Sequence, residues 1–174
     1  MATTYTLISS NVLTGSAASV TFSSIPSTYT DLVLQISARS DSTNNFDNIN
    51  IQFNGVTTGI YSMTRLYGTG ASALSDRLSN NTDNIYPAGY QSDAGATANT
   101  FGSTEIYIPN YTVAQNKSFG SFGASENNAT GNRMGPTAML FRSTAAITTI
   151  TLTKTLGTNF VTNSSFYLYG IKNS

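Results

Sequence analysis

The sequence predicts an all-β protein: a jelly-roll-like antiparallel β-sandwich of about 8–10 strands with little or no helix. Three observations support this prediction. Apolar and polar residues alternate with a period of two in several separate segments. Stretches rich in Gly, Pro, Asn and Ser separate those segments. No window of about 12 residues or more shows the 3.6-residue period of an amphipathic helix.

The clearest alternation lies in segments 30–39 and 48–54. The side chains expected to face the core in these two segments are Leu32, Leu34, Ile36, Ala38, Ile49, Ile51 and Phe53. Polar residues take most of the intervening positions, and Val33 breaks the pattern. The dipeptide Asn54-Gly55 then predicts a tight turn, because both residues accept positive φ angles.

Later segments also predict strands. Ile106 and Ile108 share a face, and segment 149–153 alternates Thr with Ile and Leu. Segment 119–125 is rich in Gly, which indicates that another backbone approaches it closely. The closing segment 166–171 is apolar on both faces, which predicts a central strand buried on both sides.

Segments 40–45, 78–84 and 127–136 are rich in turn-forming residues and are expected to be loops. The best helical candidate is segment 71–78, with one or two turns at most. No linker or composition shift divides the chain, so residues 1–174 are expected to form a single β-sandwich domain.

The charge content is low. Only 9% of the residues are charged and the formal net charge is zero, whereas about 25% is usual for soluble domains. The eight basic residues form no run. Nucleic acids and anionic lipids are bound by clustered Lys and Arg, so we expect neither a nucleic acid nor a membrane as a partner.

The N-terminal residues have no basic segment followed by an apolar one, so no secretion signal is expected. No apolar run approaches the roughly 18 residues that a membrane span needs. The expectation is a soluble protein made in a cytoplasm.

Residues that carry chemistry are scarce. The chain has no His and no Cys, which excludes the commonest general base, a Cys nucleophile and Cys or His metal sites. Glu105 lies within a strand pattern, at a position expected to face solvent. A glycosidase that uses Glu105 and Glu126 is only a remote alternative. We therefore predict that the protein is not an enzyme and has no cofactor.

One oxygen-rich loop could hold Ca²⁺. It runs from Asp41 to Asp47 and includes Asn44 and Asn45. It lacks the spacing of an EF-hand loop, and the preferred interpretation is a hairpin turn rich in Asp and Asn. No metal site is predicted.

Five tyrosines that fall near turns are candidate interface residues. They are Tyr61, Tyr67, Tyr86, Tyr90 and Tyr111. Tyr is enriched at protein interfaces and also stacks on sugars. The alternative interpretation, that they are ordinary rim residues of a β core, carries equal weight.

Six segments spread over both ends of the chain carry a family resemblance. They are Tyr5–Ser10, Ala18–Pro26, Tyr29–Leu32, Ile36–Ser40, Ile51–Gly55 and Tyr167–Lys172. The chain resembles a family of tailed-bacteriophage virion structural proteins that includes capsid decoration (cement) proteins and modules of tail fibres.

The resemblance implies a non-enzymatic virion protein, most simply a capsid decoration protein that binds the outer surface of the major capsid shell and stabilises it. Its partners would be the major capsid protein and further copies of itself in a homotrimer. It would be assembled in the host cytoplasm and lie on the capsid exterior. The alternative is a receptor- or glycan-binding module of a tail fibre or baseplate, which the tyrosines and the Asp41–Asp47 loop favour.

Overall fold

The computed structural model describes residues 5–57, 59–79, 87–128 and 131–172. In these residues the chain forms twelve β-strands and no helix, so the all-β prediction is confirmed, although the strands outnumber the 8–10 expected. The strands are β1 (Tyr5–Val12), β2 (Val20–Phe22), β3 (Asp31–Ala38), β4 (Phe46–Phe53), β5 (Tyr61–Gly68), β6 (Ala73–Ser79), β7 (Pro87–Ser92), β8 (Gly102–Ile108), β9 (Lys117–Ser125), β10 (Arg133–Phe141), β11 (Ile150–Lys154) and β12 (Ser165–Ile171).

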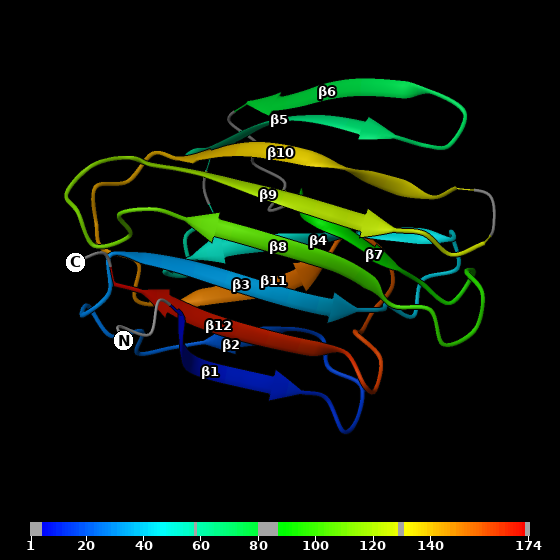
Figure 1. Ribbon diagram of the computed structural model, residues 1–174, viewed down its shortest axis with the longest axis horizontal. Helices are drawn as coiled ribbons and strands as arrows, with labels where there is room; N and C mark the ends of the chain where they lie inside the picture. The colour runs from blue at the N-terminus through cyan, green and yellow to red at the C-terminus, as the bar shows by residue number, and fades with distance from the viewer. Residues whose placement is uncertain (1–4, 58, 80–86, 129–130, 173–174) are drawn as a thin grey trace.

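The strands form two antiparallel sheets of unequal width. The larger sheet has eight strands in the order β1-β12-β3-β8-β9-β10-β5-β6, and the smaller has four in the order β2-β11-β4-β7. Figure 1 shows the larger sheet stacked in this order, with β6 at the top and β1 at the bottom. The described residues contain no candidate for a membrane-spanning helix.

The core lies between the two sheets. All seven side chains predicted to face it in segments 30–39 and 48–54 are at most 3% exposed. Phe53 of β4 lies at the centre, with its ring centroid 5.1 Å from that of Phe119 on β9 and 5.3 Å from that of Phe141 on β10. Both pairs meet edge to face, which is a favourable arrangement for aromatic rings. These contacts join the smaller sheet to the middle of the larger one.

The predicted tight turn is confirmed at Asn54-Gly55, where φ is 53° and 67°, and it leads from β4 in the smaller sheet towards β5 in the larger one. Val56 donates its amide hydrogen to the Phe53 carbonyl oxygen at 3.0 Å, which closes the turn. The Asn54 side chain also binds the loop before β11, because its amide donates to the Ala146 carbonyl oxygen at 2.8 Å. Asn54, whose positive φ angle forms the turn, therefore also fixes a neighbouring loop through its side chain.

The backbone of β7 lies unusually close to β8 and β9, and glycines make this possible. A Cβ atom on Gly123 would lie 2.6 Å from the Tyr90 amide nitrogen, and one on Gly102 would lie 2.5 Å from Gln91 Cα. Real Cβ atoms do not approach other backbone atoms this closely. The close approach predicted for segment 119–125 is therefore confirmed.

The helical candidate at 71–78 is wrong, because residues 73–79 form β6. This strand pairs with β5 from Ser62 opposite Ser79 to Gly68 opposite Ala73. Leu74, Asp76 and Leu78 share a face with the period of two that a strand requires. Pairing with β5 decides between this pattern and the weak helical one.

Two further expectations need correction. The stretch 127–136 is not all loop, because β10 begins at Arg133; Pro136 fits there because the register with β5 skips from Met134 to Thr137. The closing strand β12 has neighbours on both edges, as expected, but Tyr167 and Tyr169 on its second face are only half-buried. The reason is that the smaller sheet covers only one of the two faces of β12.

The glycine contacts predict a position-specific effect within β9. Replacing Gly123→Ala places a methyl group against the β7 backbone, and we expect the free energy of unfolding to fall by about 1–3 kcal/mol. Gly120→Ala is the matched control, because its Cβ would lie 3.7 Å from the nearest atom, the Thr137 carbonyl oxygen. Urea unfolding of both variants tests this; equal stability would contradict the close approach.

Candidate interaction surface

The outer face of the eight-stranded sheet, which points away from the smaller sheet, is a continuous surface built by strand register. One row across it consists of Leu7, Tyr169, Val33, Tyr107, Gly120 and Ala138. The next row consists of Ser10, Tyr167, Gln35, Glu105, Phe122 and Pro136. Residues far apart in sequence therefore lie side by side on this face.

This outer face exposes large apolar side chains. Each of the following is at least 42% exposed: Tyr5, Leu7, Val12, Leu66, Tyr107, Phe122 and Met134. Val33 is buried there, between its register partners Tyr169 and Tyr107. Exposed apolar side chains that gather on one face are typical of an interaction site.

One end of the outer face is hollowed. Leu66, Phe122, Met134 and Pro136 contribute to the lining of an open hollow of about 470 Å³ beside the β5–β6 hairpin. Its walls are mainly apolar and include no charged residue. A hollow of this kind suits an apolar side chain of a partner.

Polar contacts hold the centre of the outer face in place. The Tyr107 hydroxyl donates to Asp31 Oδ2 at 2.8 Å, and this hydrogen bond raises the pKa of Tyr107 above its ordinary value. Asp31 Oδ1 also accepts the Asn110 amide hydrogen at 2.9 Å. Glu105 is exposed, as predicted, and accepts a hydrogen bond from the Gln35 side chain. Among the strand residues of this face, Asp31, Glu105 and Arg77 carry charge.

The structure does not bring the five predicted tyrosines together on the surface. Tyr61, Tyr90 and Tyr111 are at most 2% exposed, so their prediction as interface residues is wrong. Their strand or loop positions direct them into the protein, where the Phe53 amide donates to the Tyr61 hydroxyl at 2.7 Å. Tyr67 is half-buried, and Tyr86 lies outside the described residues.

The apolar residues of the outer face were missed by the prediction from sequence. A signal existed for Tyr107, because it follows Glu105 by two positions and therefore shares its solvent-facing side. Leu66 alternates with Arg65 and Tyr67 in the same way. No local signal brings Leu66, Phe122 and Met134 together, because they lie on three different strands.

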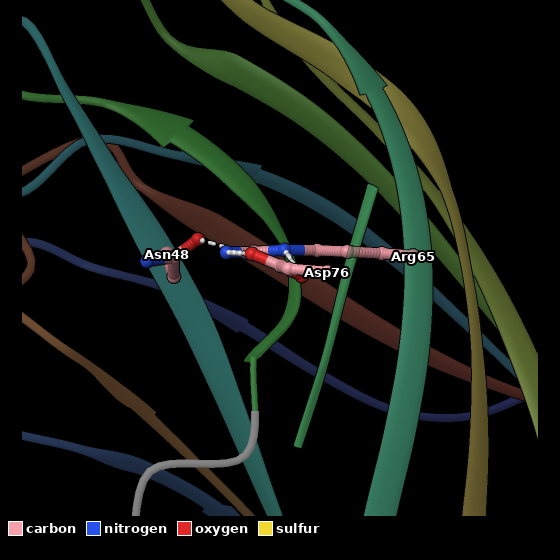
Figure 2. A network of polar contacts seen from close by, with 3 residues as sticks. All are labelled: Asn48, Arg65 and Asp76. Carbon is pink, nitrogen blue, oxygen red and sulfur yellow. Dashed lines mark hydrogen bonds and ion pairs between the residues drawn. The ribbon is translucent and has the colours of Figure 1, made fainter. Parts of the chain in front are cut away.

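A polar network fixes the β5–β6 hairpin on the opposite side of the sheet (Figure 2). Arg65 of β5 donates from Nε and Nη2 to the two oxygens of Asp76 on β6, at 2.7 and 2.8 Å. Its Nη1 donates to Asn48 Oδ1 on β4 at 3.1 Å. This bidentate geometry is the strong form of an Arg–carboxylate pair. The network therefore ties the hairpin to the smaller sheet.

Aromatic rings surround the same guanidinium. Arg65 Cζ lies 5.1 Å from the Tyr67 ring centroid and 5.7 Å from that of Tyr90. Burial alone would lower the pKa of Arg65, but the hydrogen bond and charge of Asp76 raise it above its ordinary value. Burial raises the pKa of Tyr90, although Arg65 opposes this change. The structure therefore gives Tyr67 and Tyr90 a packing role around a permanent cation.

The acidic side chains of the Asp41–Asp47 loop bind protein groups. Asp41 accepts hydrogen bonds from the Thr158 and Asn159 amides at 2.6 and 3.0 Å. Asp47 is fully buried, and its Oδ1 accepts the Asn48 and Leu156 amide hydrogens at 2.7 and 2.9 Å. In the described ranges, no three His, Cys, Asp or Glu side chains form a group that could hold a metal ion.

Comparisons with known proteins add little to this geometry. No protein-family model matches the chain. No curated protein matches it either. Among solved structures, the galectin LEC-6 of Caenorhabditis elegans has a TM-score of 0.31 at 9% identity, over 98% of this chain and 96% of that one. CG-16, a homodimeric agglutinin from chicken liver, has a TM-score of 0.24 at 12% identity, over 75% of this chain and 98% of that one. These similarities are too weak to support an argument; the two sheets themselves define the chain as an antiparallel β-sandwich protein.

The buried hydroxyl of Tyr61 predicts a stability effect. Tyr61→Phe removes the acceptor of the Phe53 amide hydrogen, and an unsatisfied buried group costs about 1–3 kcal/mol. We expect the free energy of unfolding in urea to fall by this amount. Tyr167→Phe, at a half-buried position of the outer face, is the control and should change stability little. If the Tyr61→Phe variant unfolded with an unchanged free energy, the Tyr61 hydroxyl would have no structural role.

The buried Asp47 carboxyl predicts a pH dependence of stability. Burial raises its pKa from 3.8 to about 6, although the hydrogen bonds of Leu156 and Asn48 oppose the change. Between these two values the folded protein binds more protons than the unfolded chain, so stability falls as the pH rises. Asp47 alone accounts for a loss of about 3 kcal/mol near neutral pH.

Asp47→Asn tests this pH dependence, because it keeps one oxygen for the two amides and removes the charge. Urea unfolding between about pH 4 and pH 7 should show a flatter profile for the variant, with stability at neutral pH at least equal to that of the parent. Asp41→Asn is the control, because hydrogen bonds to Asn159 and Thr158 outweigh its slight burial and lower the pKa of Asp41. The Asp41→Asn variant should therefore not flatten the fall in stability that accompanies rising pH. A parent protein that gains stability as the pH rises through this window would contradict the assignment.

Proposed function

We propose that the protein is a non-enzymatic structural protein of a bacteriophage virion, specifically a capsid decoration protein that binds the outer surface of the major capsid shell and stabilises it. The observation that carries this proposal is the outer face of the eight-stranded sheet, with its exposed apolar side chains and few charges. The family resemblance of the sequence supplies the virion context.

The outer face has the dimensions of a protein interface. Eight strands at about 4.8 Å spacing span roughly 34 Å, and a standard interface takes about 800 Å² from each partner. Apolar side chains in neighbouring rows can be buried together, which contributes about 25 cal/mol for each Å² removed from water. The few charges on this face keep the cost of desolvation low.

The proposal assigns partners and a location. The major capsid protein is the partner of the outer face, and the protein lies on the capsid exterior after assembly in the host cytoplasm. A decoration protein that binds only the assembled shell stabilises it by mass action. Further copies of the chain are the second partner; the family resemblance implies a homotrimer, whereas the free sheet edge at β1 favours two copies.

A second candidate is a receptor- or glycan-binding module of a tail fibre or baseplate. Tyr107 is 42% exposed and shares the outer face with half-buried Tyr167 and Tyr169. Tyrosine rings of this kind offer stacking surfaces for sugars. Imaging particles with labelled protein separates the two candidates, because the first requires label over the capsid and the second requires label on the tail.

The proposal predicts that charges on the outer face weaken binding to the shell. Phage particles that lack the gene for this chain are mixed with the purified protein and sedimented. We expect the parent protein to sediment with them and the variant Leu66→Lys/Phe122→Lys/Met134→Lys to bind at least about 100-fold more weakly, because three contacts of about 1 kcal/mol or more are lost.

The matched control for this experiment is Val113→Lys. Val113 is 46% exposed but lies in the loop between β8 and β9, outside the outer face. It should bind like the parent. Equal binding by the triple variant and the parent would show that the outer face does not contact the shell.

A further inference from the structure

One edge of the eight-stranded sheet is open and uncharged. Strand β1 pairs with β12 on one side, and no strand in the described part of the chain pairs with its other side. All of its residues are exposed except Ile8, which is half-buried and packs on the core. Tyr5, Leu7 and Val12 are about half exposed, at 49%, 51% and 51%. The free edge therefore offers both backbone hydrogen-bonding groups and apolar side chains.

The opposite edge of the same sheet is protected by charge. Strand β6 carries Asp76 on one face and Arg77 on the other. Charged side chains on edge strands are a common means of preventing contact with other sheets. By contrast, the first 30 residues of the chain contain no Asp, Glu, Lys or Arg. The two edges therefore differ in their capacity to accept another strand.

A bulge makes β1 complementary to itself. Its register with β12 shifts between Leu7 and Ser9, so that Tyr5, Leu7, Ser10 and Val12 lie on the outer face and Thr6, Ser9 and Asn11 on the inner face. Outward-facing and inward-facing residues therefore follow one another in the same order whether β1 is read from Tyr5 or from Val12. Without the bulge, full overlap of two eight-residue strands would place outward residues opposite inward ones.

We propose that β1 pairs with β1 of a second copy of this chain, antiparallel and across a two-fold axis perpendicular to the sheet. In the fully overlapped register, Tyr5 lies opposite Val12 of the second copy, and Leu7 lies opposite Ser10. Every directly opposed pair then shares a face and no like charges meet, which are the conditions for favourable cross-strand pairs. The formal net charge of zero adds no repulsion between copies.

The pairing has a defined consequence for the outer face. A two-fold axis perpendicular to the sheet keeps the outer faces of both copies on the same side, so the two sheets continue into one another. The contact is about 27 Å long, from eight residues at roughly 3.4 Å each. Such a contact is smaller than a standard interface, so the dimer should dissociate on dilution. The inference does not depend on the proposed capsid partner.

Sedimentation velocity of the purified chain over a range of concentrations tests the pairing. The parent protein should form a species of two copies at high concentration, with added hydrogen-exchange protection of the β1 amides. Leu7→Lys/Ser10→Lys places like charges opposite each other twice and should be monomeric, as should Leu7→Glu/Ser10→Glu. An equal mixture of the two variants should restore the two-copy species, because each Lys then faces a Glu.

Two controls accompany the charge exchange. Ser75→Lys adds a charge to the outer face of β6 and should leave the two-copy species unchanged. The four β1 substitutions are at exposed positions, and circular dichroism should show that the variants remain folded. A parent protein that stays monomeric, a species of three copies, loss of association in Ser75→Lys, or a mixture that fails to associate would each overturn the proposal.

Discussion

The unequal width of the two sheets is the constraint on which the rest of the structure depends. Four strands at about 4.8 Å spacing cannot cover eight, so one face of the larger sheet is covered only over part of its width. Beyond that part, the β5–β6 hairpin leaves Leu74 and Leu78 of β6 partly exposed, at 44% and 37%. The overhanging strands must therefore be held by something other than the core.

The two sheets are joined in different ways along this width. At β7 the backbones come close together, because Gly123 and Gly102 leave no side chain between them. At β4 the space is filled by aromatic rings, with Phe53 lying against Phe119 and Phe141. Beyond the core, Arg65 reaches from the hairpin to Asn48 on β4. The overhanging hairpin is thus positioned by a charged network, whereas β1 is positioned by backbone pairing and by Ile8.

The sequence pattern predicted the strands whose alternation reflects burial, but it could not predict how the sheets meet. Leu32, Ile51 and Ile106 repeat at the period that a half-buried strand requires, and their burial was predicted correctly. The tyrosines were misjudged because nearness to a turn does not decide the direction of a side chain; Tyr61 has the same parity as buried Met63. The outer face depends on register between strands that are distant in sequence, and no local pattern encodes that register.

The edges of the two sheets also determine where association between copies would stop. Strand β6 carries the Asp76 and Arg77 charges, β2 is only three residues long, and β7 lies against β8 and β9. Short, charged or covered edges resist pairing with another sheet, so β1 is the edge left without such protection. A pairing of β1 with itself uses both copies of that edge at once and is closed by its two-fold symmetry. Association through this edge therefore ends at two copies, whereas pairing β1 with a different edge would leave a free β1 at the end and allow a fibre to grow.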